Sequence, residues 1–201
     1  MASPMVKVVI VGGSIAGLSL ANMLQLNNID FVVLEGYPHI APQVGASLGL
    51  LPHGNRILDQ LGLYEKVLAL APPVNHFNFR NEKGVLLAEH KDTAQDFIQR
   101  HGYPVLFLDR QMVLQILYEN IQDKTKVLTN KRVVKVELEQ GGAKAITDDG
   151  CTYMGDILIG ADGIHSQVRK EMWRLSEKAS PGYIPASEST GELLCLQETF
   201  S

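Results

Sequence analysis

Three small residues, Gly12, Ser14 and Gly17, follow an apolar run near the N-terminus in the stretch VVIVGGSIAGLSLANML at 8–24. Gly12 and Gly17 stand where the pattern G-x-G-x-x-G has its first and third glycines, and Ser14 takes the middle position. In such a turn, backbone amides and the following helix N-terminus face a pyrophosphate. A serine adds only a hydroxymethyl group, which can itself donate to phosphate. The spacing predicts a dinucleotide-binding turn, although a flexible strand-to-helix turn would show the same residues.

Glu35 closes the next apolar run, DFVVLE at 30–35, about twenty residues beyond the turn. An acidic side chain at this place can accept hydrogen bonds from both ribose hydroxyls of an adenosine. The same carboxylate disfavours a ribose that carries a 2′-phosphate. We therefore expect the adenosine of FAD or NAD and not that of NADP, although a surface glutamate at the end of a strand is also common.

Two further charged residues, Arg110 and Asp162, occupy positions where ligands bind. Arg110 begins a helical pattern, and its guanidinium offers a planar fork of donors that suits phosphate. Because a cation is disfavoured at a helix N-terminus, a nearby anion explains Arg110 better than chance does. Asp162 follows the apolar run DILIGA and should lie at the carboxyl end of a strand, where α/β folds place ligands. The alternative is that Asp162 only caps the next helix.

These residues need a scaffold of alternating strands and helices. The patterns at 5–11, 14–27 and 30–35 predict a strand, a helix and a strand, which together form one βαβ unit. The strands are apolar without alternation, which is typical of a parallel sheet whose two faces are covered by helices. The expected fold class is therefore α/β, with a Rossmann-like domain built on a parallel sheet.

The rest of the chain predicts further helices and an antiparallel β portion. Residues 52–71 have helical periodicity interrupted near Gly62, and residues 108–121 return to a helix. Residues 74–90 alternate around the turn NEKG, which predicts a hairpin inside an insertion at about 74–105. Strand-like runs follow at 126–129, 132–139 and 143–147, and the last one, YMGDILIGAD at 153–162, is expected to end on a buried strand.

Composition excludes several other classes of protein. The chain has 201 residues, a net charge of -4 and 45% hydrophobic residues, so it lacks the basic excess of a nucleic-acid-binding protein. Cys151 and Cys195 lie far apart without metal-binding spacing, which favours a reducing, cytoplasmic compartment and no metal site. The N-terminal apolar run is too short for a signal peptide, and no run reaches the roughly 18 residues that span a bilayer. We expect a soluble chain.

Five features of the sequence, in this order, resemble FAD-dependent monooxygenases of the aromatic-hydroxylase type. They are the turn at 8–24, the acid Glu35, GASLGLLPHGNRILDQLGL at 45–63, LDRQMVLQIL at 108–117 and GADGIHSQVRKEMW at 160–173. Simple NAD dehydrogenases lack the last three. The likeness is greatest to fungal enzymes that epoxidise prenyl chains in meroterpenoid and indole-diterpene biosynthesis, which typically carry GGSIAGL with this same serine. The resemblance covers about residues 5 to 175.

The resemblance implies roles for individual residues. Glu35 matches the ligand of the adenosine ribose, and Gly49 matches a backbone contact to the flavin. Arg110 matches an arginine near the pyrophosphate and the ribityl chain. Asp162 matches the aspartate of a DG motif that approaches the ribityl and phosphate region. His165, at the start of the following helix, receives no role, and no catalytic side chain follows from these motifs.

The resemblance also implies a reaction and its reactants. FAD, reduced transiently by NADPH or NADH, would react with dioxygen, and one oxygen atom would enter an alkene or aromatic ring of a small apolar substrate. No metal is required. Relatives of this type are much longer: they continue into more substrate-domain strands, a GD motif and often a C-terminal hydrophobic segment, through which full-length relatives can associate with membranes.

The end of the chain departs from this pattern. Residues 1–175 are expected to form the FAD-binding domain, incomplete at its C-terminus, and residues 176–201 a poorly ordered tail without periodicity. Three interpretations stay open. The chain is a monooxygenase or an incomplete form of one; it is a truncated, non-catalytic remnant that binds FAD weakly or not at all; or it is an NAD-binding dehydrogenase, which the lack of a second catalytic pattern disfavours.

Overall fold

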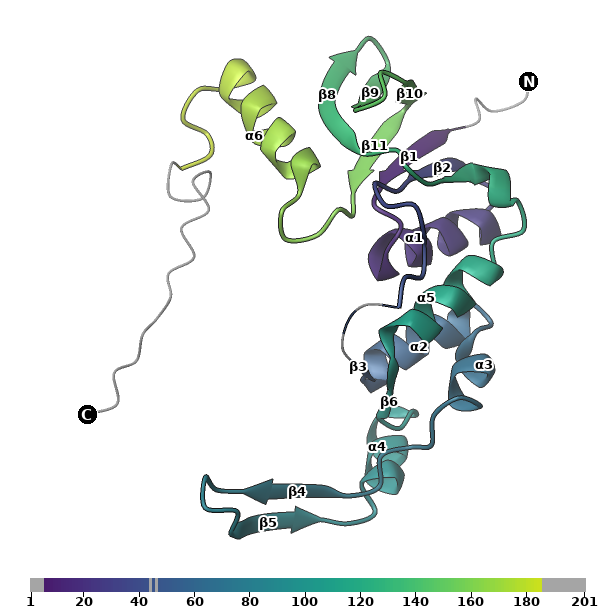
Figure 1. Cartoon of the computed structure of the whole chain (residues 1–201), viewed down its shortest axis with the longest axis vertical. Coiled ribbons are helices and arrows are strands. Elements are labelled where there is room, and N and C mark those ends of the chain that lie inside the picture. The colour runs from purple at the N-terminus through teal and green to yellow at the C-terminus, as the bar shows by residue number, and fades with distance from the viewer. Residues whose placement is uncertain (1–5, 44, 46, 186–201) are drawn as a thin grey trace.

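The structure is a computed structural model that describes residues 6–43, 45 and 47–185. Figure 1 shows two sheets at one end of the molecule, a helical layer in the middle and a hairpin that projects at the other end. Within the described residues, no helix is both long enough and apolar enough to cross a membrane.

The predicted βαβ unit forms the centre of a parallel sheet. Its elements are β1 (Lys7–Val11), α1 (Ile15–Leu26) and β2 (Asp30–Leu34). Two later strands complete the sheet, β7 (Val127–Leu128) and β11 (Ile157–Gly160). The strand order is β11-β1-β2-β7, and every neighbouring pair is parallel. The α/β class and the parallel sheet predicted from the sequence are therefore confirmed.

The two faces of the parallel sheet have different covers, because side chains alternate along each strand. Val8 and Ile10 pack with α1 in the larger core cluster, whereas Val9 and Val11 pack in a second cluster on the opposite face. That opposite face lies on a three-stranded antiparallel sheet, ordered β10-β9-β8. Its strands are β8 (Val133–Glu139), β9 (Gly142–Thr147) and β10 (Thr152–Gly155). Helices were expected to cover both faces of the parallel sheet. On this face the antiparallel strands provide most of the cover, and Val168 of the C-terminal helix packs in the same cluster.

A helical layer joins the parallel sheet to the hairpin. Its elements are β3 (Ser47–Leu50), α2 (Pro52–Gln60), α3 (Tyr64–Leu68), β6 (Leu106–Asp109) and α5 (Arg110–Glu119). β3 and β6 pair antiparallel, with Ser47 opposite Asp109. The fully buried Asn22 of α1 donates to the Leu117 carbonyl of α5 at 2.9 Å and accepts from Asn120 Nδ2 at 2.9 Å. These bonds hold the C-terminal end of α5 against α1.

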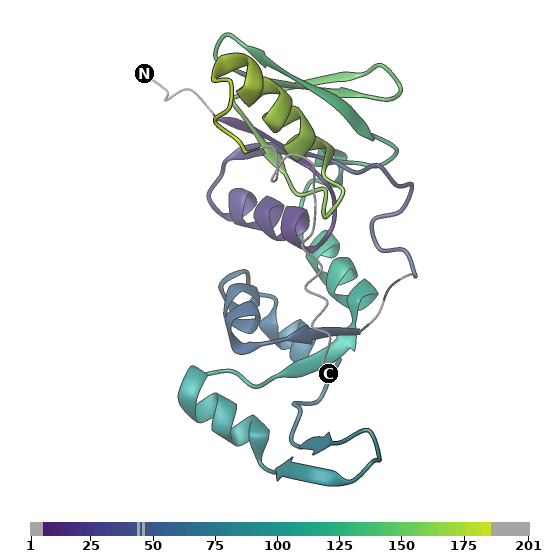
Figure 2. The same cartoon turned by 90° about the vertical axis from the view of Figure 1, so that its left-hand side faces the viewer.

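The hairpin predicted at 74–90 is present. It consists of β4 (Phe77–Arg80) and β5 (Leu86–His90), and every residue of β5 is exposed. Figure 2 shows the hairpin at the end of the molecule remote from α1, next to α4 (Thr93–His101). Neither α4 nor the short strands β3 and β6 were predicted from the sequence pattern.

The run at 153–162 was expected to form one strand, but it forms two strands, β10 and β11, which belong to different sheets. Asp156 lies between them: its carboxylate accepts a hydrogen bond from the Lys7 amide at 2.7 Å, and its amide donates to the Lys7 carbonyl at 2.9 Å. The chain therefore leaves one sheet and enters the other at this residue. β11 is also an edge strand with exposed ends, and not a buried strand. The sequence pattern did not predict this break, because both strands belong to one apolar run.

Helix α6 (Gln167–Ala179) is longer than the short helix expected after Asp162. It continues past Ser176, where the tail was expected to begin, and the structure describes the chain as far as residue 185. The remainder of that expected tail, 186–201, lies outside the described residues.

Helix α6 is held on β8 by a charged pair. Glu171, which is buried, accepts from the Val136 amide at 3.1 Å and pairs with Arg174 Nη2 at 2.7 Å. The hydrogen bond from Arg174 holds the pKa of the Glu171 carboxyl below its ordinary value. Arg174 also donates to the Val136 carbonyl at 3.0 Å, so that both backbone groups of one strand residue are bonded to the helix.

Candidate functional site

The turn between β1 and α1 has no room for a side chain at Gly12 or Gly17. Gly12 has a φ of +107°, and a Cβ built on it would lie 2.4 Å from the Ala161 carbonyl oxygen. A Cβ on Gly17 would lie 1.9 Å from the Gly12 carbonyl oxygen. Both glycines are therefore needed for the close approach of β1, α1 and the segment that follows β11.

Ser14 is the N-cap residue of α1, with an extended backbone at φ -95° and ψ -165°. Its side chain makes no capping hydrogen bond, and the first turn of the helix contains no acidic residue. The first amides of a helix have no partner within the helix, and the helix dipole places partial positive charge beside them. The N-terminus of α1 therefore offers donors and a favourable potential to an anion.

Glu35 lies against this turn. Its Oε2 accepts a hydrogen bond from the Gly13 amide at 2.6 Å, and its Oε1 accepts from the Tyr37 amide at 2.8 Å. The carboxylate at the end of β2 is thereby fixed beside the loop that begins α1. Each carboxylate oxygen has a second lone pair, so the group can still accept from ribose hydroxyls.

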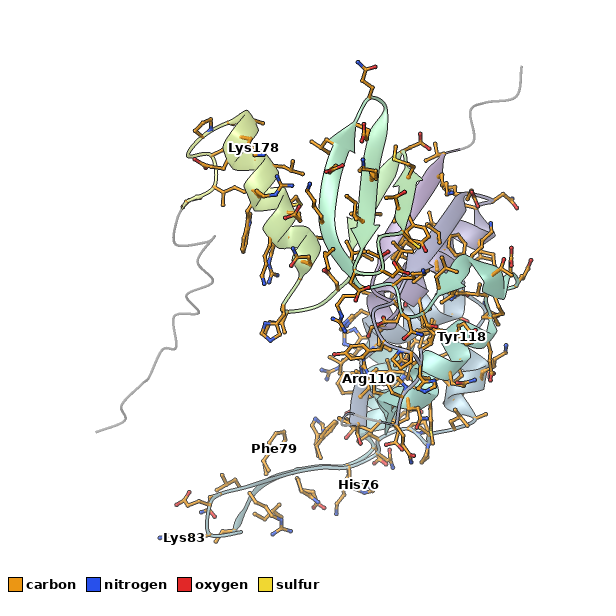
Figure 3. All side chains as sticks on the ribbon, turned by 45° about the horizontal axis from the view of Figure 1, so that its top comes forward. His76, Phe79, Lys83, Arg110, Tyr118 and Lys178 are labelled. Atoms are coloured by element: carbon orange, nitrogen blue, oxygen red, sulfur yellow. The ribbon has the colours of Figure 1, made fainter. Side chains whose placement is uncertain are left out.

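Arg110 reaches the same turn from the other end of the sequence. It is the first residue of α5, and its Nη2 donates to Ser14 Oγ at 2.6 Å. Within the part of the chain that the structure describes, no carboxylate lies within ion-pair distance of Arg110. Figure 3 shows Arg110 in the central part of the molecule, well away from Lys83 at the tip of the hairpin.

Gly49 lies apart from the turn, on β3 opposite Phe107 of β6. A Cβ on Gly49 would lie 3.1 Å from the Phe107 ring, which gives the glycine a packing reason of its own. No hydrogen bond between described residues links Gly49 to the turn. Its contact with the flavin stays a prediction.

The Asp162 side chain caps α6. Its Oδ2 accepts from the amides of Gln167 at 2.6 Å and Val168 at 3.1 Å, and its Oδ1 accepts from Ser166 Oγ at 2.6 Å. Capping, the alternative that the sequence left open, is therefore what this carboxylate does here. The backbone of Asp162 nevertheless lies beside the turn, because a Cβ on Gly12 would lie 3.0 Å from the Asp162 nitrogen. A role of Asp162 toward the cofactor stays a prediction.

The structure thus brings most of the predicted residues to one place. The side chains or backbone atoms that meet at the turn belong to Gly12, Ser14, Gly17, Glu35, Arg110 and Asp162. Two cavities of about 330 Å³ and 350 Å³ lie elsewhere, between α4, the hairpin and α2, and Phe97 and His101 line both. No residue of the turn lines either of these two cavities.

Glu35 also has neighbours from the segment after β7, which were not predicted from the sequence. The Lys131 amide donates to the Glu35 carbonyl at 2.8 Å, and the Arg132 guanidinium lies 5.2 Å from the centre of the Tyr37 ring. The Lys131 ammonium bonds to Asp149, which raises the pKa of Lys131. The strand-like run at 126–129 is the sequence signal for these residues. If that run pairs in parallel with β2, as β7 does here, the residues that follow it lie at the same edge of the sheet as Glu35.

Comparison with known proteins identifies the family. The FAD binding domain family matches residues 5–180. The chain belongs to this family. The turn between β1 and α1 therefore belongs to an FAD binding domain, as the motifs indicated. The family match gives no support to an NAD-binding dehydrogenase.

The FAD binding domain of this chain is similar to several curated fungal proteins. It is 50% identical over 185 residues to the FAD-dependent monooxygenase andE of Emericella variicolor, covering 92% of this chain and 39% of andE. It is 46% identical over 193 residues to the FAD-dependent monooxygenase prhF of Penicillium brasilianum, covering 94% of this chain and 40% of prhF. The chain thus spans about 40% of the length of these curated relatives. The predicted resemblance to fungal FAD-dependent monooxygenases is confirmed.

Solved structures agree on the fold. Klebsiella pneumoniae HpxO, complexed with FAD and uric acid, superposes with a TM-score of 0.72 at 25% identity, covering 82% of this chain and 41% of HpxO. The 2,6-dihydroxypyridine-3-hydroxylase of Arthrobacter nicotinovorans superposes with a TM-score of 0.70 at 22% identity, covering 85% of this chain and 40% of the hydroxylase. The second likeness concerns the fold alone.

Proposed function

We propose that this FAD binding domain is part of a FAD-dependent monooxygenase that uses NADPH or NADH and dioxygen to insert one oxygen atom into a small apolar substrate. The names of the fungal relatives support the reaction class. The residues around the turn support the cofactor, because their chemistry fits the two ends of an adenosine diphosphate.

The observation that carries the proposal is that Glu35 and Arg110 meet the same turn from two sides. Glu35 bonds to the Gly13 amide, and Arg110 bonds to Ser14, each at 2.6 Å. A carboxylate is an acceptor for ribose hydroxyls, and a guanidinium is a donor for phosphate. Between them lies a helix N-terminus with no acidic residue in its first turn. This donor and acceptor set suits FAD and would not suit an apolar ligand.

Each residue has a separate task in this proposal. Arg110 and the first amides of α1 hold the diphosphate, and Glu35 holds the ribose. Asp162 and Gly49 extend the site toward the ribityl chain and the flavin ring. FAD, when bound, supplies the redox chemistry that activates dioxygen, and the protein orients it and keeps water from the reacting centre.

We further propose that the reaction is the epoxidation of an alkene in a prenylated, meroterpenoid-type intermediate of fungal secondary metabolism. This finer assignment rests on the GGSIAGL stretch that begins at Gly12 and on its likeness to fungal prenyl epoxidases. Its test is to incubate the loaded protein with NADPH or NADH and a prenylated aromatic compound, and to look for a product heavier by one oxygen atom by mass spectrometry. A hydroxylated ring with an intact alkene would contradict epoxidation.

The cofactor assignment has a direct test on the 201-residue chain. The purified chain is incubated with FAD, passed through a desalting column and examined by visible spectroscopy. We expect the chain to retain oxidised-flavin absorbance after incubation with FAD. Incubation with FMN, which lacks the AMP half of FAD, should leave no retained absorbance. A chain that retains no flavin would support the non-catalytic remnant, and a chain that binds NAD in preference to FAD would support the dehydrogenase.

A further inference from the structure

We propose that Ser14 is a positioning residue: its hydroxyl holds the Arg110 guanidinium over the N-terminus of α1, so that a diphosphate is bound by the helix amides and by Arg110 together. This inference rests on the proposed function, because it concerns the same cofactor. It assigns a purpose to the one residue of the turn that departs from the glycine pattern.

The first observation is that the Ser14 side chain does not cap its own helix. Serine at an N-cap usually accepts a hydrogen bond from an amide of the first turn. Ser166, the N-cap of α6, does so and accepts from the Arg169 amide at 2.9 Å. Ser14 has the same place on α1, yet makes no capping bond and accepts from Arg110 at 2.6 Å instead. Two N-cap serines of one chain therefore have different partners.

The second observation concerns charge. Arg110 begins α5 and touches the first residue before α1, so its cation lies close to the positive ends of two helices. Within the described residues it has no carboxylate partner. A partly buried cation in such a potential is unfavourable by itself, and an arriving anion relieves the repulsion. The Ser14 oxygen is a neutral acceptor, which orients the cation without neutralising it.

The geometry gives the serine an advantage over glycine. A glycine at position 14 would let a phosphate come closer to the backbone, but it would leave Arg110 without the acceptor that orients it. The long arginine side chain then loses more rotamer freedom when it binds phosphate. Restoring the glycine of the G-x-G-x-x-G pattern should therefore weaken binding, whereas the pattern alone predicts equal or tighter binding.

The test compares FAD and ADP binding to the 201-residue chain by isothermal titration calorimetry for the wild type, Ser14→Gly, Ser14→Ala, Ser14→Thr and Arg110→Met. Ser14→Gly and Ser14→Ala should each lower the affinity about tenfold, the scale of one hydrogen bond to a charged group. Ser14→Thr keeps the hydroxyl and should retain most of the affinity. Ser19→Ala, a serine of the same helix that is not bonded to Arg110, is the matched control and should bind as the wild type does.

A double-mutant cycle separates positioning from a direct contact of Ser14 with phosphate. If Ser14 acts through Arg110, Ser14→Ala should have little further effect in the Arg110→Met background. An equal loss in both backgrounds would overturn the inference. So would a Ser14→Gly variant that binds FAD as tightly as the wild type. A wild type that binds no FAD would instead contradict the proposed function.

A measurement without ligand tests the same contact. Nitrogen NMR of the arginine side chains in the unliganded chain should show slow rotation of the Arg110 guanidinium in the wild type and in Ser14→Thr, and fast rotation in Ser14→Ala. Identical Arg110 signals in all three would overturn the role of Ser14, whatever the affinity for FAD.

Discussion

The Glu35 carboxylate and the Gly13 amide are joined by a 2.6 Å hydrogen bond, which ties the end of β2 to the turn that begins α1. Glu35 also accepts from the Tyr37 amide. The residue expected to hold the ribose therefore also holds the loop that would receive the phosphates. A substitution at Glu35 acts on both, and its test has to separate the two effects.

Glu35→Ala should weaken FAD binding by roughly 1 to 3 kcal/mol, the scale of losing hydrogen bonds to a charged group. Isothermal titration measures the affinity for FAD. The unfolding temperature of the unliganded chain reports how much stability is lost when the turn is no longer held by Glu35. Glu35→Gln keeps one acceptor oxygen, so its FAD affinity should lie between those of the wild type and Glu35→Ala. Glu82→Gln, on the exposed turn of the hairpin, is the control. Unchanged FAD affinity in Glu35→Ala would remove Glu35 from the site.

Gly17→Ala should destabilise the fold by about 1 to 3 kcal/mol or more, because overpacking forces backbone to move. Its Cβ would lie 1.9 Å from the Gly12 carbonyl oxygen. Gly54→Ala on α2 is a matched control, since its Cβ would meet nothing nearer than Leu50 Cδ2 at 3.8 Å. That variant should be neutral or more stable by roughly 0.5 to 1 kcal/mol. Urea unfolding of both variants checks the contrast, which equal effects would contradict.

Asp162→Ala should remove the cap of α6 and cost about 1 kcal/mol of stability. Ser166→Ala removes the other polar side chain of the same cap. If Asp162 also reaches the cofactor, Asp162→Ala lowers FAD affinity and Ser166→Ala does not, whereas both lower the unfolding temperature. Equal FAD affinity in the two variants would leave Asp162 with capping alone.

The Glu171–Arg174 pair predicts a pH dependence of stability. The pKa of Glu171 is lowered from its ordinary value of 4.5, chiefly by the hydrogen bond from Arg174. A carboxyl with a lowered folded-state pKa stabilises the fold above its unfolded pKa, and that contribution is lost as pH falls through the folded value. Glu171→Gln should therefore be less stable than the wild type at pH 7, and the difference should shrink in acid. Urea unfolding across this range checks it, and a difference independent of pH would contradict the assignment.

Local pattern predicted the elements that position the turn, because each is fixed by neighbours in the sequence. The apolar run of β1, the glycines of the turn and the acid at the end of β2 all lie within thirty residues of one another. The same was true of the hairpin, whose turn residues stand between two alternating runs. The contact of Arg110 with Ser14 could not be predicted in this way, because it depends on how α5 packs against α1.

Other features could not be predicted from the sequence because they depend on contacts between distant residues. The change of sheet at Asp156 depends on two bonds to the Lys7 backbone, one from the Asp156 amide and one to its carboxylate, and an apolar run does not reveal them. The cover of Val9 and Val11 by antiparallel strands, with Val168 of α6 in the same cluster, depends on tertiary packing. The two bonded oxygens of Glu35 were missed because only the folded loop brings Gly13 and Tyr37 to it.

The pairing of β1 with β11 has a consequence for how the chain folds during synthesis. β1 is made well before β11, yet the partner on one of its two sides is Ile157–Gly160. Such a distant pairing carries a large loop-closure entropy and is expected to form slowly. Until that strand leaves the ribosome, one edge of β1 is an unpaired template for other chains. A ribosome paused ahead of this strand would therefore prolong the exposure of that edge and favour aggregation of the nascent domain.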